Sequence, residues 1–337
     1  MTSKKLNVLV GTDVVDQENL DKLAKISTVY NLADLVGDRL VEVLPTIDVL
    51  LVFSWPKELT SENISKMIKL KFIQSILAGV NHIPFASLKK VTVSSNAGAY
   101  SEEVAEYAWA LLLTAAKRTV DLHNSVKDGT WNLRRTLDPA REVTILHGGT
   151  LGILGYGGIG KAVAKIAKGL RMEIMAYSRS SEASLGVKFY KGKAGLTQVL
   201  RASDAIVLAL PLTNQTTHII NASLLSEMKK SAILVNVARG ELVDEKAVFD
   251  HLQVSPNFRY ATDVWWYREG RESLKTTYPF FSLGNFVGTP HVSGPSGLAT
   301  GKPVKLAVEN TIRYLKGLRP RNVVDPSEYL AQGPQPY

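Results

Sequence analysis

The chain has 337 residues, enough for about two domains that each bury a core, and this length excludes a small disulfide-stapled protein. Hydrophobic residues make up 45% and charged residues 21%, an ordinary globular composition that excludes a disordered chain. The absence of cysteine excludes disulfides, thiolate nucleophiles and cysteine-ligated metals. The net charge is +9, and most of the excess lies in residues 161–201, which hold nine basic residues against Glu173 and Glu182.

Neither the length of the apolar runs nor the first residues of the chain indicate a membrane or secreted protein. Residues 1–10 do not resemble a signal peptide, and no apolar run approaches the about 18 residues of a membrane span. A cysteine-free chain also fits a reducing compartment. We therefore expect a cytoplasmic protein without a membrane partner.

Short β-branched runs recur about every twenty residues through the first hundred residues, with helical spacing between them. Runs without polar alternation suit strands that are buried on both faces, and their order with helices indicates βα units in a parallel sheet. The expected strands are residues 6–10, 49–53, 72–77 and 91–94.

A long helix is expected next, from Ser101, whose hydroxyl can cap it, to about Thr119. Its apolar positions cover more than one face, which predicts packing on two sides. A second series of βα units follows, and the last helix is expected at residues 303–318. The strands of this second series are expected at residues 151–154, 173–177, 205–210, 233–237, 260–264 and 286–287.

The strongest motif is Gly155-Tyr156-Gly157-Gly158-Ile159-Gly160, a G-x-G-x-x-G run between an expected strand and an expected helix. Gly155 permits a tight turn, Gly157 lets backbone N–H groups approach a pyrophosphate, and Gly160 lets helix and strand pack closely. The pattern predicts a dinucleotide site. The alternative is a strand-to-helix turn that is merely tight.

The end of the next strand indicates which dinucleotide binds. A site for NAD usually places an acidic residue there, which bonds the ribose hydroxyls and repels a 2′-phosphate. Here the strand ends in Ser178-Arg179-Ser180, which offers hydroxyls and a guanidinium suited to a phosphate, and Lys188, Lys191 and Lys193 follow. We expect NADP to be preferred, with NAD held by a solvated loop as the alternative.

These motifs, in this order, resemble the D-isomer-specific 2-hydroxyacid dehydrogenases, which include glyoxylate, hydroxypyruvate, glycerate and phosphoglycerate dehydrogenases. The resemblance covers nearly the whole chain. Besides the glycine motif, its carriers are residues 78–80, 96–98, 104–106, 210–213, 236–244, 262–264 and 289–294. It implies that Leu210, Pro211, Val237, Ala238 and Asp263 also contact the cofactor.

The family resemblance implies an α/β fold of two doubly wound parallel-sheet domains, Rossmann-like and flavodoxin-like, with a cleft between them. Residues 1–99 and 292–337 would form a discontinuous substrate-binding domain, and residues 100–291 would bind the dinucleotide. A homodimer through the nucleotide domain is also implied. The doubly apolar helix at residues 101–119 is consistent with that assembly.

Two residues carry the chemistry by resemblance. Arg239 would hold the substrate carboxylate and polarise its carbonyl, and His291 would act as the acid and base. The alternative for Arg239 is an ion pair with Asp244 or Glu241. The backbone N–H groups of Ala78-Gly79-Val80 would meet the substrate carboxylate, unless this segment is a plain βα turn.

The chain departs from the family where the glutamate partner of the catalytic histidine is expected, five residues after the aspartate of the D-V motif. That fifth residue is Arg268, and a glutamate, Glu269, comes one position later. A one-residue slip in an extended chain turns a side chain to the opposite face. Either a bulge or insertion brings Glu269 to His291, which we favour, or the histidine works without this carboxylate.

The sequence therefore predicts an oxidoreductase that transfers a hydride between NADP(H) and a small 2-keto or 2-hydroxy acid, without a metal. The alternative is a non-catalytic protein that senses dinucleotides on the same fold. A nucleic-acid partner is disfavoured, because no recognised DNA- or RNA-binding motif accompanies the basic window.

Overall fold

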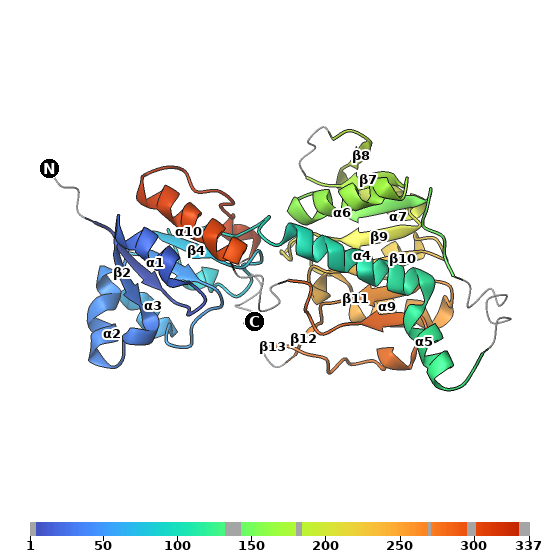
Figure 1. Ribbon diagram of the computed structural model, residues 1–337, viewed down its shortest axis with the longest axis horizontal. Coiled ribbons are helices and arrows are strands. Elements are labelled where there is room, and N and C mark those ends of the chain that lie inside the picture. Colours follow the sequence, from blue (N-terminus) through green and yellow to red (C-terminus); the bar gives the residue numbers. More distant parts are fainter. Residues whose placement is uncertain (1–4, 132–142, 180–183, 269–270, 295–300, 330–337) are drawn as a thin grey trace. The chain divides into compact units, whose positions relative to one another are not determined.

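The structure, a computed structural model, describes residues 5–131, 143–179, 184–268, 271–294 and 301–329. The chain divides into two units, which are residues 1–100 with 295–337, and residues 101–294. Each unit contains a parallel sheet with helices packed on it (Figure 1). The expected α/β fold of two doubly wound, parallel-sheet domains is confirmed.

The first unit has a five-stranded parallel sheet in the order β2-β1-β3-β4-β5, the flavodoxin-like order. The last helix of the chain, α10, packs on this sheet beside α1, so the two ends of the sequence share one core. The strands are β1 (Asn7–Val10), β2 (Thr28–Asn31), β3 (Val49–Val52), β4 (Phe72–Ser75) and β5 (Thr92–Ser94). The helices are α1 (Gln17–Ala24), α2 (Asp38–Val43), α3 (Ser61–Lys66) and α10 (Gly301–Leu315).

The second unit has a seven-stranded parallel sheet in the order β14-β11-β10-β9-β6-β7-β8, which is the Rossmann order extended by one strand. The strands are β6 (Thr150–Leu154), β7 (Glu173–Tyr177), β8 (Val187–Tyr190), β9 (Ala205–Leu208), β10 (Ile233–Asn236), β11 (Arg259–Thr262) and β14 (Phe286–Gly288). The helices are α4 (Ser101–Lys117), α5 (Thr119–Lys127), α6 (Gly158–Gly169), α7 (Gly192–Ala202), α8 (Ala222–Ser226) and α9 (Glu245–Val254). A separate antiparallel hairpin pairs β12 (Tyr267–Arg268) with β13 (Arg271–Glu272).

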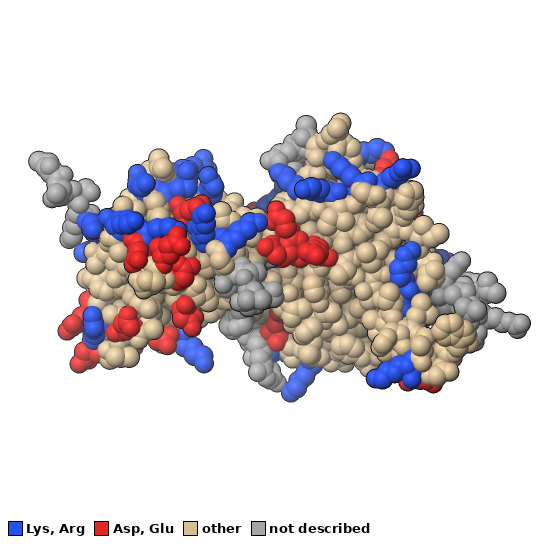
Figure 2. All heavy atoms as spheres, viewed as in Figure 1, with Lys and Arg blue, Asp and Glu red and all other residues tan. Residues whose placement is uncertain are grey.

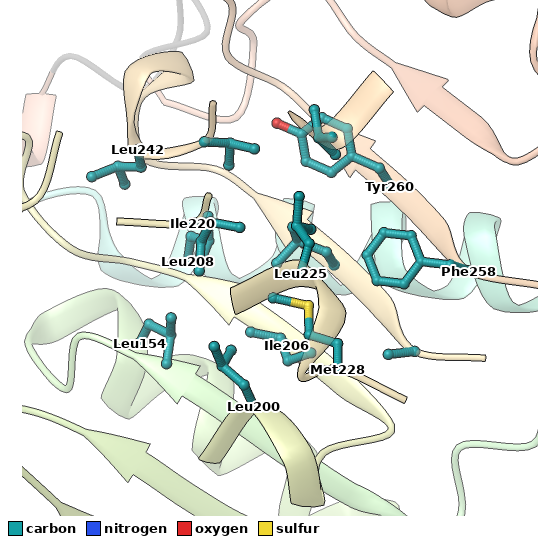
Figure 3. Close-up of a cluster of buried hydrophobic side chains, with 14 of the residues drawn as sticks. Leu154, Leu200, Ile206, Leu208, Ile220, Leu225, Met228, Leu242, Phe258 and Tyr260 are labelled. Atoms are coloured by element: carbon teal, nitrogen blue, oxygen red, sulfur yellow. The ribbon is translucent and has the colours of Figure 1, made fainter. Parts of the chain in front are cut away.

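Alternate residues of the second sheet face two different cores. Leu154, Ile206 and Leu208 join side chains of α7, α8 and α9 in one buried cluster, which Figure 3 shows. The residues between them face the opposite side, where α4 and α6 pack against each other and Trp109 Nε1 donates to Val163 O at 3.1 Å. Burial on both faces explains why these strands appear in the sequence as continuous apolar runs.

Two strands that the sequence analysis missed, β2 and β8, lie at sheet edges. Their residues are mostly half-buried and include polar side chains, so neither forms an apolar run. An edge strand faces solvent along one side, and its sequence therefore resembles a loop. The patterns predicted the interior strands of both sheets but not these edges.

The long helix of the second unit ends earlier than expected. Arg118 has a φ of +54°, and this left-handed residue separates α4 from α5. The expected cap is wrong, because Ser101 is the first residue of α4 and its hydroxyl is buried without a hydrogen-bond partner among the described residues. Within the described ranges, no helix combines the length and hydropathy needed to cross a membrane.

Candidate active site

A glycine loop connects β6 to α6. Gly155 has a φ of +102°, and a Cβ on it would lie 2.5 Å from the carbonyl oxygen of Ala209. A Cβ on Gly160 would lie 2.1 Å from the carbonyl oxygen of Gly155, whereas a Cβ on Gly157 would meet no atom within 4 Å. The loop is therefore closely packed around one open position at the start of α6. Backbone N–H groups and the helix dipole favour an anion there, so the loop fits a pyrophosphate.

Of the other residues of the glycine loop, one is packed in the core and two are exposed or partly exposed. Tyr156 is buried, its ring meets Phe189 edge-on with centroids 5.0 Å apart, and its hydroxyl lies 3.0 Å from Ser184 Oγ. Gly158 is exposed and Ile159 is half-buried at the first turn of α6. The side chain of Tyr156 is thus used in packing against β8, and only its backbone is available to a ligand.

The end of β7 carries no acidic side chain at its described positions. Ser178 is half-buried, its backbone N donates to Tyr190 O at 3.2 Å, and Arg179 is exposed. Ser180 lies outside the described residues. Lysine and arginine side chains gather on the surface near α6 and α7 (Figure 2). Of the three lysines expected to add positive charge near the phosphate, Lys188 forms an ion pair with Glu173, which offsets its charge.

The other predicted cofactor residues follow neighbouring strands of the same sheet. Leu210 and Pro211 follow β9, and the buried Val237 and Ala238 follow β10. Because the strands are parallel, their carboxyl ends share the edge at which the glycine loop leaves β6. β6 lies between β7 and β9, where the strand order reverses, which is the usual ligand position in doubly wound sheets.

Arg239 lies on the loop after β10, and the fully buried Asn236 shapes this loop. Asn236 Nδ2 donates to Arg239 O at 2.8 Å, and Asn236 Oδ1 accepts from Ala238 N at 3.1 Å. A Cβ on Gly240 would lie 2.3 Å from the carbonyl carbon of Trp265. Glycine at this position therefore allows the arginine loop to pack directly on the backbone that leads into the β12–β13 hairpin.

The segment that carries His291 is fixed by Asp263, whose side chain is fully buried. Asp263 Oδ1 accepts from Thr289 Oγ1 at 2.6 Å and from Val292 N at 3.1 Å, and Oδ2 accepts from Ser293 N at 2.7 Å. These bonds hold the chain on both sides of His291, which has a φ of +54°. Such a backbone conformation persists in a non-glycine residue only where neighbouring contacts enforce it. The Asp263 carboxylate thus positions the histidine.

The β12–β13 hairpin brings a carboxylate to His291. Glu272 Oε2 lies 2.5 Å from His291 Nδ1, and Glu272 Oε1 accepts from Trp265 N, also at 2.5 Å. About a fifth of the Glu272 side chain and a quarter of the His291 side chain are exposed, at 21% and 25%. With Nδ1 directed at the carboxylate, the ring orientation is fixed and Nε2 is the nitrogen on the opposite side.

Glu272 is the site residue that the sequence analysis missed. Glu269, which it favoured, lies outside the described residues. The two segments Tyr267-Arg268 and Arg271-Glu272 are separated by two residues, Glu269 and Gly270, the spacing of a tight hairpin. That spacing could have indicated that the glutamate of interest returns on the second strand.

Glu241, Tyr267, Arg239 and Glu272 influence one another electrostatically. Burial raises the pKa of Glu241, and the charge of Glu272 raises it further while Arg239 and a 2.7 Å bond from Tyr267 N lower it. Burial also raises the pKa of the Tyr267 phenol. The charge of Arg239 lowers this pKa, whereas the charges of Glu272 and Glu241 raise it further. The structure therefore brings the arginine loop and the Glu272–His291 pair into one electrostatic environment.

The two alternative partners of Arg239 also contact other groups, and the charge of Arg239 lowers the pKa of Glu241. Asp244 caps α9 by accepting from Ala247 N at 2.8 Å, and Glu241 accepts from the hairpin backbone. Across the described ranges, no group of three His, Asp or Glu side chains lies close enough to hold a metal ion. The groups gathered here are those of proton transfer and of anion binding.

The predicted substrate-binding segment, Ala78-Gly79-Val80, belongs to the first unit and follows β4. Val80 is buried in the core of that unit, whereas Ala78 and Gly79 are half-buried. The segment is thus anchored at Val80 and partly accessible at the two small residues before it. Its contact with a substrate stays a prediction.

Comparison with known proteins identifies relatives of the whole chain. Residues 109–293 match the family described as D-isomer specific 2-hydroxyacid dehydrogenase, NAD binding domain. A glyoxylate reductase of Aeropyrum pernix is 34% identical over 266 residues, which cover 78% of each chain. A crystal structure from Pyrobaculum aerophilum, proposed to be a formate dehydrogenase, is 33% identical with a TM-score of 0.82, covering 96% of this chain and 100% of that one.

A further solved structure contains a bound cofactor. It is an acyclic imino acid reductase in complex with NADPH and D-Arg, 25% identical, with a TM-score of 0.77 and coverage of 95% of this chain and 100% of that one. The resemblance of the motifs to the hydroxyacid dehydrogenases is therefore confirmed. The chain belongs to the D-isomer specific 2-hydroxyacid dehydrogenase family and is an NAD(P)-dependent hydroxyacid oxidoreductase.

Proposed function

We propose that the chain reduces small 2-keto acids to 2-hydroxy acids with NADPH, and catalyses the reverse oxidation. The observation that carries this proposal is the Glu272–His291 pair, held by Asp263 at the carboxyl edge of a dinucleotide-binding sheet. The similarity to a glyoxylate reductase supports a keto acid as the substrate. A protein that only sensed dinucleotides would need no such pair, and the relatives do not favour that alternative.

His291 and Arg239 divide the work on the substrate. NADPH, when bound, would supply the hydride for the new C–H bond at the carbonyl carbon and would leave as NADP⁺. The carbonyl π electrons go to the oxygen, and His291 protonates that oxygen through Nε2, because Glu272 lies at Nδ1. The Glu272 carboxylate balances the positive charge that the His291 ring carries before it gives up its proton. Arg239 holds the carboxylate and polarises the carbonyl.

The decisive experiment measures the oxidation of NADPH, and separately of NADH, with a panel of 2-keto acids. We expect turnover by the parent, and we expect His291→Asn to lose about a thousandfold in kcat, since both the proton donor and its partnership with Glu272 disappear. His291→Asn should still bind NADPH. A parent that binds NADPH but turns over no keto acid would instead support the sensor.

We also propose that NADPH is preferred over NADH. Ser178 and Arg179 at the end of β7 provide a hydroxyl and a guanidinium for the 2′-phosphate. Neither of these two described positions carries a carboxylate that would repel the phosphate. Arg179→Ala should reduce the ratio of kcat/KM for NADPH to that for NADH by about tenfold. Lys188→Ala is the control, because Lys188 is already paired with Glu173. An unchanged ratio in Arg179→Ala would contradict the proposal.

A homodimer through the second unit is proposed as well, in the cytoplasm. Helix α5 has no buried residue, and Val120, Leu122 and Val126 on it are 49%, 40% and 56% exposed. Trp131, just beyond it, is 79% exposed. A second copy would cover these side chains. The molar mass in solution tests this assembly, and Val126→Glu should yield a monomer if it is correct.

A further inference from the structure

Tyr267 is a second side chain on the hairpin face that carries Glu272. The two residues stand opposite each other in the β12–β13 register, and directly opposed residues of an antiparallel pair project to the same face. Arg268, the next residue, projects to the other face and pairs with Glu245. The alternation directs Tyr267 to the side of the hairpin on which Glu272 meets His291.

The charges that act on Tyr267 are those of the proposed reaction centre. Its phenol is half-buried, and burial raises its pKa, with Arg239 opposing that rise and Glu272 adding to it. The hydroxyl is therefore protonated near neutral pH and is a hydrogen-bond donor. It lies within the electrostatic reach of both the group proposed to hold the substrate carboxylate and the group that orients the histidine.

Two hydrogen bonds to the segment after β10 constrain the backbone at Tyr267. Tyr267 N donates to Glu241 Oε1 at 2.7 Å, which ties the hairpin to the loop of Arg239. The preceding residue, Trp266, is buried and its Nε1 donates to Val243 O at 2.8 Å. A side chain on a backbone with such contacts is suited to discriminate between ligands, because its starting position is constrained.

From this placement we propose that Tyr267 determines substrate specificity, by donating a hydrogen bond to a polar substituent on C3 of the keto acid. The proposal rests on the proposed function. Arg239 and His291 would engage the carboxylate and the carbonyl, so the variable part of the substrate begins at C3. A donor on the same face as Glu272 selects 2-keto acids with an acceptor at C3 over those with a hydrocarbon there.

Hydroxypyruvate and pyruvate are matched probes, because they differ by one hydroxyl group on C3. The experiment measures kcat/KM for both substrates in the parent and in Tyr267→Phe, which keeps the ring and removes the hydroxyl. We expect the ratio of kcat/KM for hydroxypyruvate to that for pyruvate to fall about tenfold, mainly through a higher KM for hydroxypyruvate. Equal losses for both substrates, or no loss, would overturn the proposal.

Tyr278→Phe is the matched control, because Tyr278 is a half-buried tyrosine of the same unit whose ring stacks on Phe249 at 5.1 Å. It should leave the substrate ratio unchanged. Thermal unfolding and NADPH binding report whether each variant is folded, and Tyr267→Leu repeats the test should the phenylalanine variant not fold. If the parent reduces no keto acid, the proposed function fails, whereas turnover with an unchanged ratio removes only the role of Tyr267.

Discussion

The glycine loop and the histidine centre lie at the carboxyl edge of one sheet, but they are built differently. The loop uses six consecutive residues, 155–160, and acts through backbone groups. The histidine centre joins the loop after β10, the β12–β13 hairpin and the segment after β14 through side chains. A contiguous backbone site is specified locally, whereas a site of side chains depends on contacts between distant segments.

Among the variants that compare the histidine centre with the glycine loop, the largest effect should come from the Asp263 carboxylate, on which the histidine centre depends. Asp263→Asn keeps the size of the side chain, but its amide nitrogen cannot accept a hydrogen bond, so either the buried Ser293 N or the part-buried Val292 N loses its acceptor. We expect the free energy of unfolding to fall by about 2–3 kcal/mol and kcat/KM to fall about a hundredfold. Urea unfolding and steady-state kinetics measure the two effects.

Asp250→Asn serves as the control for this variant, because Asp250 is exposed and pairs with Lys246, four residues before it on α9. Such a surface pair contributes little to stability. Asp263→Asn with the stability and turnover of the parent would show that the segment around His291 is held by something else.

A smaller effect should separate the two glutamates of the hairpin region. Glu272→Gln removes the negative charge beside His291 Nδ1 and allows the ring to take the wrong tautomer, so kcat should fall about thirtyfold. Glu269→Gln should leave kcat unchanged. Steady-state turnover of both variants decides between them, and a larger loss in Glu269→Gln would assign the role to Glu269.

The smallest effect should appear in the glycine loop and should concern binding alone. A Cβ at Gly157 meets no protein atom, so Gly157→Ala should keep the thermal stability of the parent while the Kd for NADPH rises about tenfold. Gly160→Ala is the contrasting variant, because its Cβ clashes with Gly155 O and should lower stability. Unchanged NADPH affinity in Gly157→Ala would show that the open position does not face the cofactor.

The sequence predicted those parts of the fold and site that depend on local pattern. Interior strands such as β3 and β9 are buried on both faces, so their apolar runs identified them. The edge strands β2 and β8 lack that burial and lack the pattern. Asp263 was expected as a cofactor contact from the family resemblance alone, while its three hydrogen bonds reach residues 26 to 30 positions later.

Glu272 is the residue of the site that spacing along the sequence did not identify. Its spacing from Asp263 departs from the family pattern, so counting along the chain favoured the nearest glutamate. Only the pairing of β12 with β13 reveals that Glu272 lies opposite Tyr267. A motif defined by fixed spacings does not detect a hairpin, because strand pairing places residues opposite each other that are not neighbours in the sequence.

The hairpin also determines how this site tolerates changes in length. It forms a two-stranded sheet of its own and adds no strand to the seven-stranded sheet, so lengthening both of its strands would not change the pairing within that larger sheet. Side chains alternate between the two faces with a period of two residues. Related chains could therefore gain or lose residues here in symmetric pairs and still present a carboxylate to the imidazole, whereas one extra residue on β13 would turn it away.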